Sequence, residues 1–153
     1  MNPFDPKSAL LAKHAQHVVL VHFPIALFLT GVAFDFATRW TKEATNRAAL
    51  AAAARLNLIA AAVFVLPTLA TGIAAWRWQL EGQRLKGILL FHLLAASVSA
   101  FLICLLGWIN LRRRRTPDSV FPAGYMLLEI LTSMVVALAG HLGGFLSGVN
   151  VPG

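Results

Sequence analysis

The stretch HVVLVHFPIALFLTGVAFDFA, residues 17–37, decides the fold class of this chain. Nearly all of its side chains are apolar, and about 20 such residues cross the hydrocarbon core of a bilayer at about 1.5 Å per residue. The run is too long for the apolar region of a signal peptide, and Asp35 and Arg39 follow where a cleavage site would be expected. It is therefore predicted to be a transmembrane helix.

Three further apolar runs of similar length cover about residues 56–76, 87–109 and 123–145. Pro67 in the second run is expected to kink that helix or to free a carbonyl near Val63. Lipid cannot satisfy a freed carbonyl, so a neighbouring helix or hydroxyl has to do so. The Ala-rich stretch 45–55 indicates that this helix begins outside the bilayer. We expect one all-α domain over residues 1–153, an up-down bundle of four transmembrane helices.

Composition supports lipid as the solvent of this chain. Of its 153 residues, 58% are hydrophobic and 12% are charged, whereas roughly a quarter are charged in soluble domains. A net charge of +7 suggests nucleic acid in a soluble protein, but here Lys and Arg lie between the apolar runs and no basic-aromatic stretch occurs. The expected partner is the bilayer, not nucleic acid. Cys104 is the only cysteine, which excludes an internal disulfide.

Basic residues predict the orientation of the four spans. One side of the bundle is expected to carry Arg39, Lys42, Arg47, Arg55 and the run Arg112–Arg115, and the termini side to carry Lys7, Lys13, Arg77, Arg84 and Lys86. The positive-inside rule places the first set in the cytoplasm. Both termini are then periplasmic, and the expected location is the bacterial inner membrane.

The histidines form the candidate functional site. With alternating helices, all five lie on the termini side, and His22, His92 and His141 fall at a common depth of roughly 8–10 Å. Ionisable side chains inside a span are rare and point to function. The simpler interpretation is that each imidazole is a hydrogen-bond partner between helices.

Haem b is the cofactor that this arrangement favours, since haem iron accepts axial imidazoles from facing helices. The preferred ligand pair is His22 with His92 or His141. Small residues beside the candidate ligands would leave room for a porphyrin: Ala95, Ala96, Ser99, Gly140, Gly144 and Gly148. Arg77 and Arg84, with Lys86, are candidates to pair with propionates. The glycine repeat is equally typical of simple helix packing.

Other ligands suit the same histidines. Three neutral imidazoles could bind zinc or copper with an open fourth position, and a histidine could donate to the carbonyl of a quinone. The leading hypothesis is an electron-transfer protein of the b-type cytochrome kind. Its electrons would pass between membrane quinone and a periplasmic redox protein or dehydrogenase. The alternatives are a cofactor-free anchor or assembly subunit and a transition-metal-binding protein; a homo-oligomer is compatible with each.

The carboxylates lie at the opposite end of the spans. Glu129 should be partly buried near the start of the fourth helix, with Arg55, Arg39 or Asn57 as its partner, because an unpaired charge is costly there. Polar residues are not expected to continue across the cytoplasmic halves of the helices, so a through-channel is not predicted.

Several motifs together resemble a known family. They are His17-Val-Val-Leu-Val-His22-Phe-Pro-Ile-Ala-Leu, Thr71-Gly72 with Ala74-Ala75-Trp76, His92 early in the third span, and Gly140-His141-Leu-Gly-Gly. The chain resembles, over all four helices, the bacterial membrane family catalogued as domain of unknown function 2231. The resemblance implies a four-helix membrane domain and implies no activity, so the redox hypothesis depends on the histidines alone.

Overall fold

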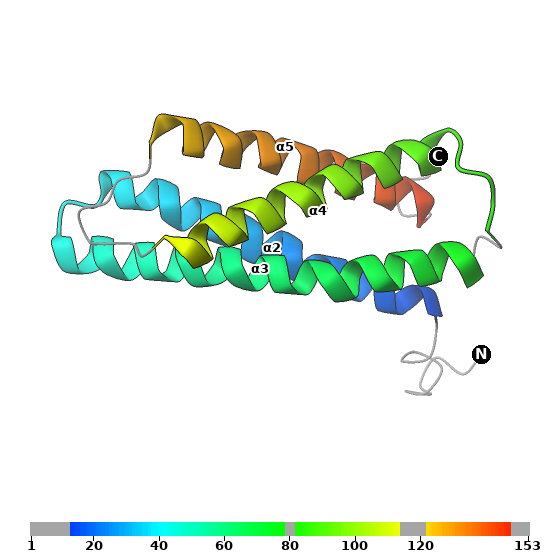
Figure 1. The fold of residues 1–153 in the computed structure, drawn as a ribbon, viewed down its shortest axis with the longest axis horizontal. Helices are drawn as coiled ribbons and strands as arrows, with labels where there is room; N and C mark the ends of the chain where they lie inside the picture. Colours follow the sequence, from blue (N-terminus) through cyan, green and yellow to red (C-terminus); the bar gives the residue numbers. More distant parts are fainter. Residues whose placement is uncertain (1–12, 79–81, 114–121, 148–153) are drawn as a thin grey trace.

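The computed structural model describes residues 13–78, 82–113 and 122–147. They form four helices: α2 (Lys13–Trp40), α3 (Ala44–Trp78), α4 (Ile88–Arg112) and α5 (Ala123–Leu146). The helices run alternately up and down along one long axis (Figure 1). Each is long and apolar enough to cross a membrane. The predicted all-α membrane bundle is therefore confirmed, and α3 begins ahead of its apolar run as its Ala-rich start indicated.

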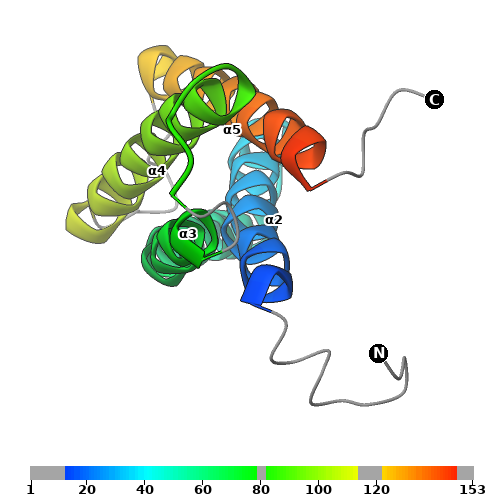
Figure 2. The same cartoon turned by 90° about the vertical axis from the view of Figure 1, so that its right-hand side faces the viewer.

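The helices associate unevenly around the bundle. α2 and α3 pack along much of their length, and α4 lies between α3 and α5, whereas α2 and α5 touch at only a few points. The end-on view shows α2 with α3 on one side and α4 with α5 on the other (Figure 2). The boundary between α2 and α5 is consequently the most sparsely packed of these neighbouring helix pairs.

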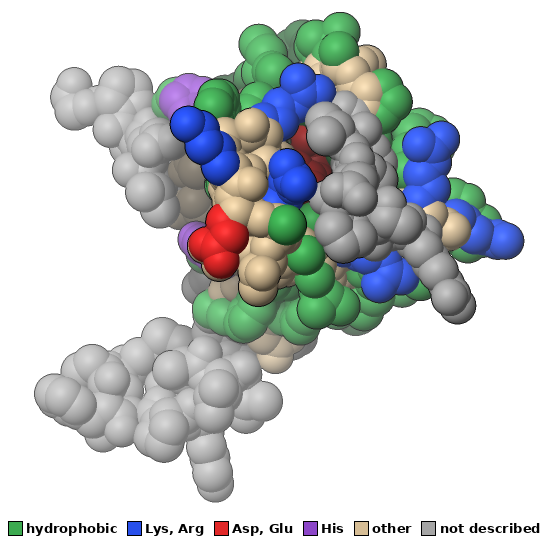
Figure 3. Space-filling model, turned by 90° about the vertical axis from the view of Figure 1, so that its left-hand side faces the viewer, with side chains coloured by type: hydrophobic (Ala, Val, Ile, Leu, Met, Phe, Trp, Pro, Cys, Tyr) green, Lys and Arg blue, Asp and Glu red, His purple; other side chains and the backbone are tan. Residues whose placement is uncertain are grey.

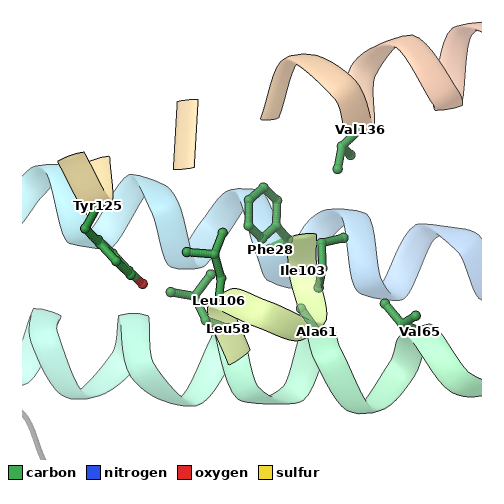
Figure 4. Packing of buried hydrophobic residues seen from close by; sticks show 8 residues of the cluster. All are labelled: Phe28, Leu58, Ala61, Val65, Ile103, Leu106, Tyr125 and Val136. Carbon is green, nitrogen blue, oxygen red and sulfur yellow. The ribbon is translucent and has the colours of Figure 1, made fainter. Parts of the chain in front are cut away.

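Two glycines let three helices approach closely around Leu58. A Cβ added at Gly31 of α2 would lie 2.8 Å from Cγ of Leu58, and one added at Gly107 of α4 would lie 3.1 Å from the Leu58 carbonyl oxygen. Leu58 is fully buried and belongs to the apolar core with Phe28 and Leu106 (Figure 4). Lipid tails are as apolar as Leu, so close packing at small residues, rather than escape from water, brings these helices together.

Proline in α2 is accommodated by a hydroxyl on α3. Pro24 has no N–H, so the carbonyl of Leu20 loses its partner within the helix. The Thr68 hydroxyl lies 3.3 Å from that carbonyl oxygen and 2.9 Å from the Phe64 carbonyl of its own helix. The single Thr68 proton is therefore shared between the freed carbonyl of α2 and the closer carbonyl of its own helix, while α3 continues through Pro67 as one helix.

Cations gather at the end of the bundle that carries the α2–α3 connection. We call this the basic end, defined by Arg39, Lys42, Arg47, Arg55, Arg112 and Arg113. Figure 3 looks onto it and shows Lys and Arg side chains spread across the face. The guanidinium of Arg112 lies 4.2 Å from the ring centroid of Trp108, an arrangement suited to a membrane interface. Arg114 and Arg115 lie outside the described residues.

Adding one methyl group at Gly107 tests the close helix approach. The Cβ would lie 2.5 Å from Cβ of Ala62, and a helix backbone cannot yield as a flexible side chain does. We expect Gly107→Ala to destabilise the bundle by about 1–3 kcal/mol, seen as a lower thermal midpoint by circular dichroism in detergent. Gly140→Ala is the control, because nothing lies within 4 Å of its added Cβ. Equal midpoints for the two variants would contradict the close approach.

Candidate functional site

All four histidines whose side chains are described lie toward the end opposite the basic end, which we call the histidine end. The gathering predicted from alternating helices is therefore found for His17, His22, His92 and His141. Their surroundings differ: His17 and His92 are half-buried, whereas His22 and His141 are exposed. The side chain of His14 lies outside the described residues.

His17 lies in the seam between α2 and α3. Its Nδ1 is 3.3 Å from the Thr71 hydroxyl, and a Cβ added at Gly72 would lie 3.0 Å from the ring. The single hydroxyl proton of Thr71 is best placed on the Pro67 carbonyl, which is closer at 2.9 Å. Nδ1 of His17 is then the donor to Thr71, and the Thr68 carbonyl is a second acceptor beside the ring. In the neutral ring, Nε2 therefore carries the free electron pair.

His92 is held in the same tautomer in the seam between α4 and α5. Its Nδ1 lies 3.0 Å from the carbonyl oxygen of Ala139, and a carbonyl can only accept, so Nδ1 carries the proton. The ring lies over Gly143, where an added Cβ would be 3.1 Å from Cε1. No described residue hydrogen-bonds Nε2 of His92, which leaves that nitrogen available to a ligand.

The two half-buried imidazoles lie on helices of opposite pairs, His17 on α2 and His92 on α4. Each ring has Nδ1 engaged by the protein and Nε2 as its basic atom. A histidine that binds a metal usually has its second nitrogen held in this way. The pair could thus ligate a metal or accept a proton.

His22 and His141 do not join this pair. Nδ1 of His22 donates to the carbonyl of Val18 in its own helix at 2.6 Å, and the exposed ring of His141 packs edge-on against Phe145 at 4.9 Å. Within the described parts of the chain, no group of three or more His, Cys, Asp or Glu could hold a metal ion. His22, His92 and His141 are not brought together as such a group in the described structure, because depth alone does not decide which way a residue faces.

The remaining predicted site residues are scattered around the histidine end. Gly140 has open space beside it, Gly144 is partly buried, and Arg77 and Arg84 are exposed; Gly148 lies outside the described residues. The glycine that contacts His92 is Gly143. No role was predicted for Gly143, and His17 was not predicted to be a ligand, although Thr71-Gly72 belongs to the motifs that resemble the family.

Buried polar groups do continue into the basic half, contrary to expectation. Asn110, Glu129 and Thr132 have no exposed surface. Nδ2 of Asn110 donates to the Tyr125 hydroxyl at 2.6 Å, and Nε of Arg55 donates to the Asn110 carbonyl at 2.9 Å. These bonds join α3, α4 and α5. Glu129 was expected in this half, but Asn110 and Thr132 were not, because single polar residues on each helix converge only in the folded bundle.

Two of the predicted partners of Glu129 have other bonds. Arg55 directs Nε to Asn110, and Nδ2 of Asn57 donates to the Ala53 carbonyl of its own helix at 2.9 Å. Glu129 is fully buried rather than partly buried as expected. Its helix places it one turn from Tyr125 and one turn from Ser133, whose hydroxyl donates to the Glu129 carbonyl at 2.8 Å.

Imidazole tautomers test this description of the site. In protein labelled with 15N at histidine, at a pH where the rings are neutral, we expect His17 and His92 to be protonated at Nδ1 in two-bond proton–nitrogen correlation spectra. Thr71→Val should weaken the preference of His17 for this tautomer and leave that of His92 unchanged, because the valine keeps the shape and removes one of the two acceptors, the Thr68 carbonyl being the other. Thr30→Val, at an exposed site on α2, is the control. Nδ1 of either ring unprotonated in the parent protein would contradict the assigned bonds.

Comparison with known proteins gives a family and no closer relative. No curated protein and no solved structure matches the chain. The family model for a predicted membrane protein, domain of unknown function 2231, matches residues 13–150. That range includes all four helices and every described histidine. The chain belongs to the family of predicted membrane proteins defined by domain of unknown function 2231.

Proposed function

We propose that this protein is an electron-transfer protein of the bacterial inner membrane that binds haem b with His17 and His92 as axial ligands. One observation carries the proposal: the two half-buried imidazoles, on helices of opposite pairs, each have Nδ1 bonded by the protein, which leaves Nε2 as the basic atom. The ligand pair differs from the one expected from depth, since His92 is kept and His17 replaces the exposed His22 and His141.

The residues around the two rings fit such a group. Thr71 and Ala139 hold the Nδ1 atoms, and this second hydrogen bond fixes a ligating ring and raises its basicity. Gly72 and Gly143 let each ring lie directly against a helix backbone. Bound haem would supply one-electron chemistry through its iron, and the axial imidazoles would help to set its potential.

Exposed cations at the histidine end could help to bind the haem. Arg77 and Arg84 are exposed at the histidine end, where they could pair with the haem propionates. The donor and acceptor that we propose are membrane quinone and a periplasmic redox protein or dehydrogenase. A second copy of the chain is a further possible partner.

Optical spectra of four single-alanine variants test the ligand pair. Detergent-purified protein from cells supplied with haem should show a Soret band and, after dithionite, a sharp alpha band. His17→Ala and His92→Ala should lose the haem complement, because each removes an axial ligand. His22→Ala and His141→Ala are matched controls on exposed faces of α2 and α5 and should retain it.

The outcomes of this experiment separate the hypotheses. Haem retained by both His17→Ala and His92→Ala would exclude the proposed ligands. Haem lost only from the His22 or His141 variant would instead support the ligand pair predicted from depth, His22 with His92 or His141. A parent spectrum without haem would remove the cytochrome hypothesis, and stoichiometric zinc or copper in that protein would favour a metal-binding one.

A second candidate function is a cofactor-free subunit that anchors or assembles a larger complex. The observation that favours it is that imidazoles bond to helix carbonyls, His92 to Ala139 and His22 to Val18. The His92 bond joins α4 to α5, and an interhelical bond of this kind is worth about 0.6–2 kcal/mol in membranes. In this case the His17→Ala and His92→Ala variants would lose stability, and the parent protein would bind neither haem nor metal.

A fusion reporter tests the proposed orientation. Alkaline phosphatase joined to the C-terminus should be active. A green fluorescent protein joined at the same position and exported by the same route should not fluoresce. The physical reason is the concentration of cations at the basic end, which is retained in the cytoplasm. Reporters joined after Lys42, in the α2–α3 connection, should give the opposite pattern. An inactive phosphatase with a fluorescent C-terminal fusion would reverse the assigned topology.

A further inference from the structure

The hydroxyl of Ser99 is an exception among the buried polar groups of this bundle. Ser99 lies in the middle of α4 with 6% of its surface exposed. Its Oγ is buried and has no hydrogen-bond partner among the described residues. Leaving a buried hydroxyl unsatisfied is costly, and no water is available inside the bilayer to compensate.

Other hydroxyls in the helices show how this cost is normally avoided. They donate to a carbonyl of their own helix, three or four residues earlier: Thr38, Thr68, Thr71, Thr132 and Ser133. Ser99 has the same option in the carbonyl of Ala95 and does not take it. Its hydroxyl is therefore left for a partner other than its own backbone.

Ser99 lies deeper in the bundle than His92 on the same face of α4. The two are seven residues apart, which is close to two helical turns and about 10 Å along the axis. Asn110 meets Tyr125 and His92 meets Ala139 in the antiparallel α4–α5 pair, so Ser99 lies level with α5 between Thr132 and Val136. Only the alanines Ala95 and Ala96 separate Ser99 from His92 on this face of α4.

We infer that the Ser99 hydroxyl binds the head group of a membrane quinone beside the histidine pair. A hydroxyl both donates and accepts, so it can pair with the carbonyl of a quinone and with the hydroxyl of the quinol. The depth of Ser99 requires a lipid-soluble ligand, and the side chains next to it on this face of α4, Ala95 and Ala96, are small. The sparse contact between α2 and α5 is the least obstructed approach from lipid. This inference deepens the proposed function by assigning its quinone site, but the binding itself needs no haem.

Binding of a short-chain ubiquinone analogue to the full-length protein in nanodiscs tests the inference. We expect Ser99→Ala to raise the Kd about threefold to tenfold, as for the loss of one hydrogen bond. Ser97→Ala is the matched control, because that serine is exposed on the same helix. Ser99→Ala should also raise the thermal midpoint of the ligand-free protein, since it removes an unsatisfied group.

The possible results distinguish this inference from the haem proposal. Equal Kd values for Ser99→Ala and the parent, or no binding of ubiquinone or menaquinone analogues by the parent, would overturn the quinone site. Optical spectra of the same samples report haem separately, and Ser99→Ala should keep its full complement. A Ser99-dependent Kd in protein without haem would support the quinone site while removing the cytochrome hypothesis.

Discussion

The absence of water in the bilayer is the constraint on which this structure depends, because every polar group must find its partner within the protein. The Thr68 hydroxyl on α3 lies within hydrogen-bond distance of the carbonyl that Pro24 frees on α2. Asn110 forms hydrogen bonds where α3, α4 and α5 meet, and His92 forms one where α4 meets α5. The same bonds that satisfy single groups therefore also tie the helices together. Ser99 does not follow this rule among the described residues, and for that reason it points to a ligand.

The bundle is held differently along its length. Around Leu58 the helices approach at Gly31 and Gly107, and apolar side chains complete a tight core. Toward the histidine end the contacts between helices include imidazoles that lie over Gly72 and Gly143. Apolar packing fixes the helices at the centre, and hydrogen bonds of defined direction orient the rings at the end. The hydrogen bonds at Nδ1 thereby leave Nε2 as the basic atom of both His17 and His92.

The proposed haem site and the inferred quinone site occupy successive levels of one face of α4. His92 lies near the start of the helix, and Ser99 lies two turns deeper, at the level where we infer that a lipid-soluble ligand binds. A redox protein that exchanges electrons with quinone needs its two sites to be near each other, and this spacing provides that. Helix packing alone would explain the glycines and the His92 bond, but it leaves the buried Ser99 hydroxyl without a reason.

The sequence by itself determined that there are four transmembrane helices, which residues they contain and at which end the histidines gather, because run length and alternation of direction are one-dimensional properties. Only the tertiary structure decided which histidines face inward. His17 and His22 are five residues apart, or about 140° around a helix, so one of them can contact α3 while the other is exposed. Depth can be counted along a chain, but rotation of a helix is set by its neighbours, here by Thr71 and Gly72. For the same reason Gly143, and not Gly140, lies under His92, and the burial of Asn110 and Thr132 beside the predicted Glu129 was not foreseen.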